Sequence, residues 1–276
     1  MIREASLDVK ATRLAGWSPN GPDVPIHRRQ PRPAITGMDM FAASQFKNAI
    51  DSSPDSNYTH VTFLIELSMF WSLNRCHAFR CSNSLRLGPG VDWSGAAPIV
   101  FCGKPLAGSD RRAEVRSLWN QGFLFTRFDV ESCQLHARVK DHDGDGLWLD
   151  DGIEILFDPL RQRTRQYLPD DFAYHINILN AVYDDRGTDA GAPDSSWTGS
   201  AEHRVEILGN KRYAIEVAVP WEEIGVEPIA GQTLIGVDFC VNGSHPETWE
   251  YDYFDWCGLP LFHDPSGFGD LILRND

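Results

Sequence analysis

Five aspartates fall between residues 141 and 151, in the segment DHDGDGLWLDD. Three of them, Asp141, Asp143 and Asp145, stand at alternate positions and are followed by Gly146. Calcium loops begin in this way, with carboxylates at positions 1, 3 and 5 and a glycine at the turn. The glutamate that an EF-hand has at position 12 is replaced by Gly152, so the pattern is not an EF-hand. Two interpretations remain open, a simpler calcium site and a solvated acidic turn.

One tryptophan, Trp148, lies within this acidic segment. Its neighbours Gly146, Asp150 and Asp151 are residues typical of a loop. An indole exposed on a loop offers a flat surface on which the apolar C–H face of a pyranose can stack. Trp148 is therefore a candidate ligand-binding residue.

Two segments that follow place polar side chains on one face of a predicted sheet. In GIEILFD (152–158) the isoleucine side is the natural core face, so Glu154 points away from the core. In 172–179 the apolar residues likewise leave His175 and Asn177 on the other face. A carboxylate, an imidazole and an amide on one sheet face suit a ligand rich in hydroxyl groups. The alternative is that they are ordinary solvated residues.

The elements that would position these residues are short strands, because apolar and polar residues alternate with period two between turn signals. A single helical turn is expected at 220–225, which begins with proline and ends with glycine. This pattern predicts an all-β fold, a β-sandwich rather than a parallel α/β sheet. The candidate strands are 113–119, 122–129, 133–140, 152–158, 172–179, 203–208, 213–220, 233–241 and 268–273.

The strand pattern begins near residue 89, so we expect a sandwich domain over 89–276. Residues 1–88 are expected to form an N-terminal extension that is largely irregular or disordered. Its stretch 18–34, SPNGPDVPIHRRQPRPA, is rich in proline and arginine, and no functional motif occurs before residue 88.

Charge and composition exclude several classes of partner. The net charge is −14, and the acidic excess falls within 89–276, so this domain would repel the phosphate backbone of nucleic acid. The apolar run 61–73 contains Glu66 and is too short to cross a bilayer, so no membrane partner is expected.

No signal segment is expected in residues 1–30. The six cysteines lack metal-site spacing.

Four blocks of the sequence resemble carbohydrate-binding module family 9. LWLDDGIEILFDP resembles the motif W-x-x-D-x-(I/V)-E-I-F of that family, and FHDPSGFGDLIL is similar to its closing W-x-D-P-S-x-F-G-x-L motif. AEVRSLWNQGFLFTRFDV resembles its paired strands, and YAIEVAVPWEEIG with GQTLIGVDFCVNG resembles its strand, helical turn and strand. The blocks occur in the family's order and cover about residues 89–276.

The resemblance implies a sandwich of two antiparallel sheets, a structural calcium ion, and a slot that holds the end of a sugar chain between two tryptophans. By this resemblance Trp148 matches the first tryptophan and Glu154 a ligand-binding glutamate. The second tryptophan falls on Phe262 and a ligand-binding arginine on His175. Phe262 keeps a stacking face without the indole N–H, and His175 lacks the fork of donors of a guanidinium.

The function expected from these observations is non-catalytic saccharide binding, as an accessory to polysaccharide breakdown by glycoside hydrolases. Carboxylate pairs such as Glu154 with Asp158 or Asp151 are common in an acidic chain, and no nucleophile, phosphate or dinucleotide motif occurs, so no catalytic residue is assigned. No organic cofactor is expected. The compartment is not determined by the sequence, although the resemblance suggests an extracellular or periplasmic one.

Two other functions remain open. One is a structural sandwich that binds no sugar. The other is a haem-binding sandwich, in which methionine and histidine would ligate the iron. All four methionines precede residue 89, which leaves only histidine ligands within the domain.

Overall fold

The computed structural model describes residues 74–103, 111–132, 134–244, 251–259 and 263–275. All of them lie in one compact unit, Met69–Asp276. The expected irregular extension over residues 1–88 therefore lies mostly outside the described residues. Within the described residues, no helix has the length and apolar character needed to cross a membrane.

Short strands dominate the described residues, which also contain one turn of α-helix and two 3-10 turns. The strands are β1 (Arg75–Arg80), β2 (Ile99–Gly103), β3 (Arg111–Trp119), β4 (Phe123–Glu131), β5 (Gly152–Asp158), β6 (Phe172–Asn177), β7 (Val182–Gly187), β8 (Pro193–Asp194), β9 (Glu202–Gly209), β10 (Arg212–Pro220), β11 (Leu234–Ser244), β12 (Tyr251–Asp255) and β13 (Gly269–Arg274). The helical elements are η1 (Leu147–Leu149), α3 (Trp221–Ile224) and η2 (Pro265–Gly267).

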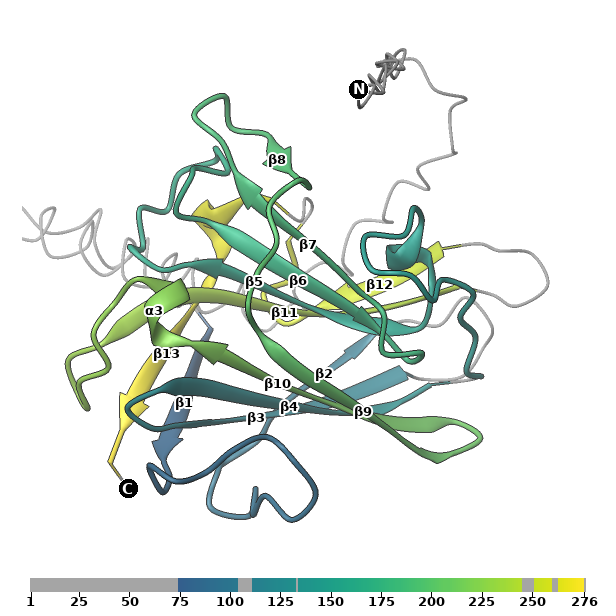
Figure 1. Cartoon of the computed structure of the whole chain (residues 1–276), viewed down its shortest axis with the longest axis horizontal. Helices are drawn as coiled ribbons and strands as arrows, with labels where there is room; N and C mark the ends of the chain where they lie inside the picture. The colour runs from purple at the N-terminus through teal and green to yellow at the C-terminus, as the bar shows by residue number, and fades with distance from the viewer. Residues whose placement is uncertain (1–73, 104–110, 133, 245–250, 260–262, 276) are drawn as a thin grey trace, which may run out of the picture. The chain divides into compact units, whose positions relative to one another are not determined.

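The strands form one continuous sheet in the order β8-β7-β6-β5-β11-β13-β1-β3-β4-β10-β9, with β12 beside β11 and β2 beside β3. This sheet folds over on itself, so that its two halves face each other (Figure 1). We call β5, β6, β7, β8, β11 and β12 the first layer, and β2, β3, β4, β9 and β10 the second layer; β13 and β1 join them. The predicted all-β sandwich is confirmed.

The core lies between the layers and is built by the predicted alternation of apolar residues. Side chains at every second position of β5, β6 and β10 point inward and form one hydrophobic cluster with residues of the other strands. Those inward residues are at most 2% exposed: Ile153, Ile155, Phe157, Phe172, Tyr174, Ile176, Tyr213, Ile215, Val217 and Val219. The burial of these side chains is the main driving force for holding the layers together.

The strand β1 corrects the expected start of the domain. It pairs in parallel with both β13 and β3, whereas the other pairings are antiparallel. It is therefore an integral strand of the sandwich, although it lies upstream of residue 89, where we expected the domain to begin. The sandwich thus begins by residue 75, inside the predicted extension.

The stretch 133–140 was expected to be a strand, and the described residues 134–140 are not one. Carboxylates take the place of a strand partner there: Asp151 Oδ2 accepts a hydrogen bond from His136 N at 2.5 Å, and Asp150 Oδ2 accepts one from Val139 N at 2.9 Å. The alternation in this stretch therefore reflects an extended segment tied to the residues before β5 by these side chains and by one backbone hydrogen bond, from Asp151 N to His136 O at 2.8 Å.

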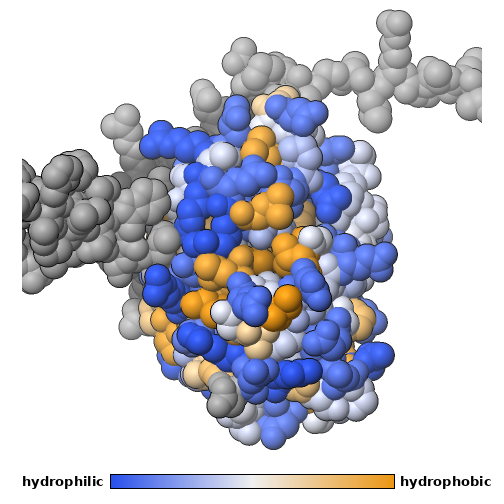
Figure 2. All heavy atoms as spheres, turned by 90° about the vertical axis from the view of Figure 1, so that its left-hand side faces the viewer, coloured by the Kyte–Doolittle hydropathy of each residue, from blue (hydrophilic) through white to orange (hydrophobic). Residues whose placement is uncertain are grey.

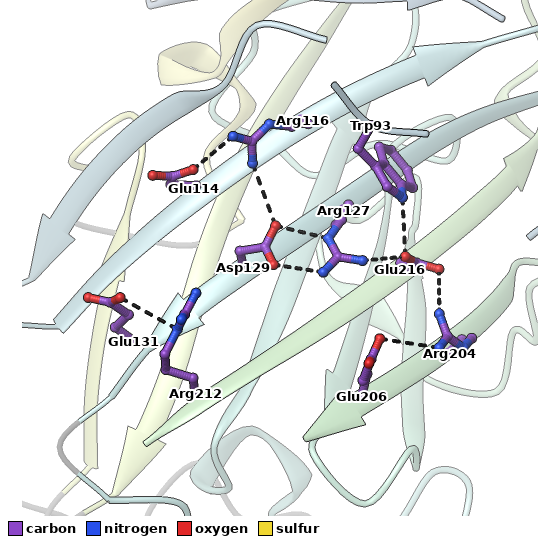
Figure 3. Close-up of polar contacts among 10 residues, drawn as sticks. All are labelled: Trp93, Glu114, Arg116, Arg127, Asp129, Glu131, Arg204, Glu206, Arg212 and Glu216. Atoms are coloured by element: carbon purple, nitrogen blue, oxygen red, sulfur yellow. Dashed lines mark hydrogen bonds and ion pairs between the residues drawn. The ribbon is translucent and has the colours of Figure 1, made fainter. Parts of the chain in front are cut away.

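The outer face of the second layer carries a network of arginines and carboxylates (Figure 3). Arg127 makes a two-point contact with Asp129, at 2.9 and 2.8 Å, and its Nη1 lies 2.6 Å from Glu216 Oε1. Arg204 Nη1 donates to the other Glu216 oxygen at 3.0 Å, and Trp93 Nε1 donates to Oε1 at 3.2 Å. Glu216 is thereby neutralised and covered, and its exposed fraction is 2%.

Apolar residues gather near the middle of another face, beside α3, with polar residues around them (Figure 2). Exposed apolar side chains are ordinary on folded proteins, so this patch by itself indicates no partner.

Candidate ligand-binding site

Neighbouring strands bring Glu154 and His175 together on the outer face of the first layer. The two residues are direct cross-strand partners between β5 and β6. His175 Nδ1 lies 2.8 Å from Glu154 Oε1. On the other side, Asn242 of β11 donates its Nδ2 hydrogen to the same oxygen, and Tyr251 OH donates to Asn242 Oδ1 at 3.1 Å. The structure therefore places two of the predicted residues in one polar cluster.

Both members of this pair are buried, although they lie on the outer face of the sheet. Glu154 is 1% and His175 5% exposed. The solvated alternative therefore does not describe them. Glu154 Oε2 has no hydrogen-bond partner among the described residues. A buried carboxylate oxygen without a partner is costly, which makes it a natural acceptor for a ligand hydroxyl.

The pair is an ion pair at neutral pH. Burial alone would lower the pKa of His175, but the charge of Glu154 and the contact with Asp185 outweigh it and raise the pKa to about 10. Burial would raise the pKa of Glu154, and His175 lowers it below its ordinary value. His175 is thus a hydrogen-bond donor in this pair and not an acceptor.

The C-terminal segment explains why this outer face is covered. Phe268 is fully buried and packs on Leu156, Ala173 and Cys240, which lie on the outer face of β5, β6 and β11. This segment also carries His263, whose ring lies 6.5 Å from the ring of His175, centroid to centroid. The outer face is therefore split between a small apolar cluster and the polar pair.

Trp148 lies on η1 and is half-buried. Gly146 starts this turn with a left-handed backbone (φ 78°), and buried Leu147 anchors it. The indole meets the ring of Tyr183 edge to face, with centroids 5.5 Å apart, and Tyr183 meets the ring of His175 at 5.4 Å. Trp148 thus lies at the end of a row of rings that leads to the polar pair.

Asn177 holds the loop that carries Trp148. Its Nδ2 donates to Val139 O at 2.7 Å and to Asp150 Oδ2 at 2.9 Å. Its Oδ1 accepts from Leu179 N and Ala181 N, both at 3.0 Å. These bonds use the full capacity of the amide, so Asn177 positions the loop and has no free group for a ligand. Phe262 lies outside the described residues.

The three aspartates of the acidic loop do not form one group. Asp143 lies with His142 and Asp184, and the ligand atoms of these three residues are within 4.8 Å of one another. Asp141 and Asp145 belong to no such group among the described residues. The calcium site predicted at Asp141, Asp143 and Asp145 is not one of these close groups and stays a prediction.

A second group of carboxylates, Asp158, Asp170 and Asp171, was missed by the sequence analysis. Asp158 accepts hydrogen bonds from the backbone N–H groups of Gln162 and Arg163, at 2.9 and 3.0 Å. Oxygens Asp170 Oδ2 and Asp171 Oδ1 are buried without a partner in the described part of the chain. Burial, with the charges of Asp158 and Asp170, raises the pKa of Asp171 to about 7, against a backbone hydrogen bond that lowers it.

Comparison with protein families gives the group to which this fold and site belong. The family described as Carbohydrate family 9 binding domain-like matches residues 93–276. The chain belongs to this family. The match includes Trp148, Glu154 and His175, and the resemblance seen in the four sequence blocks is confirmed.

Relatives of the family 9 domain include much longer proteins. Endo-1,4-beta-xylanase A of Thermoanaerobacterium saccharolyticum is 27% identical over 184 residues, which are 66% of this chain and 14% of that protein. Exoglucanase XynX of Acetivibrio thermocellus is 28% identical over 170 residues, which are 60% of this chain and 14% of that protein. The chain therefore spans only a small part of the length of these relatives.

A solved structure shares the fold of the family 9 domain. It is the family 9 carbohydrate-binding module from Caldicellulosiruptor kristjanssonii in complex with cellotriose. The TM-score is 0.58 at 18% identity, and the match covers 74% of this chain and 95% of that one. The likeness supports the sandwich architecture.

Proposed function

We propose that this domain binds a saccharide on the outer face of its first layer and has no catalytic role of its own. The observation that carries the proposal is Glu154, a buried and ionised carboxylate with one oxygen unpartnered, close to a row of aromatic rings. Sugar hydroxyls can donate to such an oxygen, and pyranose C–H faces can stack on aromatic rings. Membership of a carbohydrate-binding family supports the same function.

Each residue of the proposed site has a distinct task. Trp148 supplies the stacking face, Glu154 accepts hydroxyl hydrogen bonds, and the His175 imidazolium orients Glu154 by pairing with it. Asn177 supports the Trp148 loop. Phe262 remains the proposed second stacking residue, on the basis of the family resemblance.

The setting proposed for this activity is polysaccharide breakdown, in which the domain would hold a glycan near a glycoside hydrolase. Two relatives named as a xylanase and an exoglucanase support this setting. It implies an extracellular or periplasmic location. The domain itself needs no catalytic pair, because binding alone raises the effective concentration of the substrate.

Calorimetry with cello- and xylo-oligosaccharides tests the proposal. Trp148→Ala should weaken binding by about 2 kcal/mol, or about thirtyfold, because stacking aromatics carry much of the energy of such contacts. Val100→Ala is the matched control, because Val100 is 48% exposed on β2 in the second layer. Equal affinity of the wild type and Trp148→Ala would reject the slot. No binding of any glycan by the wild type would favour the structural role.

We also propose that the structural calcium ion implied by the family resemblance binds at Asp158, Asp170 and Asp171 and not at the acidic loop. Calcium prefers several oxygen ligands, which these three carboxylates offer, whereas Asp143 is grouped with an imidazole. The buried unpartnered oxygens of Asp170 and Asp171 support this choice.

The calcium proposal is tested by thermal unfolding with calcium and with a chelator. Calcium should raise the melting temperature of the wild type, since it binds only the folded state. Asp171→Asn should remove this shift and Asp143→Asn should keep it. The reverse pattern would restore the acidic loop as the site.

A further inference from the structure

A second group of ligands lies beside the Glu154–His175 pair. His175 of β6, Asp185 of β7 and His263 of the C-terminal segment place their ligand atoms within 4.8 Å of one another. His175 Nε2 lies 3.7 Å and His263 Nε2 lies 3.5 Å from the same oxygen, Asp185 Oδ2. The adjacent strands β6 and β7 and the distant C-terminal segment thus meet around one carboxylate oxygen.

The spacing of these atoms is too long for hydrogen bonds and fits a shared metal ion. Neither Nε2 atom has a hydrogen-bond partner among the described residues, and His175 is 5% exposed. Tetrahedral zinc with bonds of about 2.0–2.2 Å to nitrogen and oxygen separates neighbouring ligand atoms by about 3.3–3.5 Å. The two measured distances are close to this separation.

Neighbouring side chains contact the three ligand residues and fix their orientation, as is usual for the ligands of a metal ion. His175 has its other ring nitrogen 2.8 Å from Glu154 Oε1, which fixes Nε2 toward Asp185. Tyr167 OH donates to Asp185 Oδ1 at 2.8 Å, so Oδ2 is the oxygen left for an ion. The ring of Tyr167 also packs on His263, with centroids 4.5 Å apart. Each ligand is therefore held by a neighbour.

We propose that His175, Asp185 and His263 bind a divalent transition-metal ion, with zinc as the probe. Two imidazoles and one carboxylate suit such an ion better than calcium, which prefers oxygen ligands. In the metal-bound state the ion replaces the proton on His175 Nε2. The Nδ1–H group of His175 continues to donate its hydrogen bond to Glu154 Oε1. Three protein ligands leave one position for water or for a hydroxyl group of a ligand.

The test measures metal binding by the full-length, tag-free protein without any sugar, so its outcome is independent of the proposed saccharide binding. Chelator-treated protein is titrated with zinc by calorimetry. The wild type should bind zinc at one site that is weakened at least tenfold in His263→Ala and in Asp185→Asn. His142→Ala is the matched control, because it disables the other histidine-containing group, and it should keep the wild-type affinity at this site.

Cobalt distinguishes this site from cysteine sites, because thiolate ligands add a near-ultraviolet charge-transfer band that a nitrogen and oxygen site lacks. The wild type should show the visible bands of tetrahedral cobalt without that band, and His263→Ala should lose them. His263 is the safer variant, since its side chain is 29% exposed, and melting curves of the metal-free proteins verify folding. Equal zinc affinity in the wild type and His263→Ala, loss of binding in His142→Ala, or no zinc binding by the wild type would each overturn the proposal.

Discussion

Asp238 is a buried carboxylate on β11, and the proposed sites do not use it. It is 2% exposed, and its Oδ1 accepts hydrogen bonds from Phe239 N at 2.8 Å and Cys257 N at 3.1 Å. Burial and the nearby charge of Asp255 raise the pKa of Asp238 to about 8, against the lowering effect of these hydrogen bonds. The folded state therefore binds a proton that the unfolded state has already released at neutral pH.

This difference predicts that Asp238 makes the free energy of unfolding fall as pH rises. The decline runs from the ordinary value of 3.8 to about 8, because in that window the folded state binds more protons than the unfolded state. Asp238→Asn should flatten the decline and be more stable than the wild type near pH 8, by up to a few kcal/mol. Urea unfolding of both proteins from pH 4.5 to 8.5 measures the effect. Parallel profiles would contradict it.

At single residues the sequence indicated side-chain direction better than side-chain environment. Alternation was enough to place Glu154 and His175 on one face. Their burial could not be predicted, because residues of other segments surround them: Asn242 bonds Glu154, and the rings of Tyr183 and His263 lie beside His175. Tyr183 and Asp185 were missed, since the segment VYDDRG has the polar composition of a turn and its strand is defined by pairing with β6.

Among the strands of the second layer, the network around Glu216 makes a stability prediction. Glu216 is buried and accepts hydrogen bonds from Arg127, Arg204 and Trp93. Glu216→Gln removes the charge and turns one acceptor into a donor that faces arginine donors. The free energy of unfolding should fall by about 1–3 kcal/mol, as expected for lost hydrogen bonds to charged groups.

Glu206→Gln is the control for this change. Glu206 also pairs with Arg204, at 3.2 Å, but its side chain is 44% exposed. An exposed pair of this kind contributes at most about 1 kcal/mol, so the control should unfold close to the wild type. Chemical denaturation measures the free energy of unfolding of both variants. A larger loss in Glu216→Gln would show that the network depends on its buried centre. Equal losses in the two variants would indicate a set of independent surface pairs.

Most strands in which apolar and polar residues alternate were predictable; β1, which also alternates, was not. β3, β4, β5, β6, β9, β10, β11 and β13 all overlap predicted segments, and α3 lies within the predicted turn, where Gly225 ends it with φ 78°. β7 and β12 carry acidic residues or tyrosines at half or more of their positions, which hides the alternation. The stretch 134–140 shows the opposite failure, because it alternates without pairing as a strand.

For the whole described unit, the parallel pairing of β1 with β13 has a mechanical consequence. Their register runs from Arg75 opposite Asp270 to Phe79 opposite Arg274. A pulling force applied before β1 and after β13 acts along both strands in opposite directions, so it loads the whole ladder in shear.

Single-molecule pulling measures this resistance. Handles at Asn74 and Asn275 should give a high unfolding force, because the hydrogen bonds between β1 and β13 must break together. Handles at Glu202 and Ala218 pull on directly opposed residues of antiparallel β9 and β10, so that ladder should open bond by bond at a lower force. If both geometries yield at the same force, the β1–β13 ladder is not the mechanical clamp of the domain.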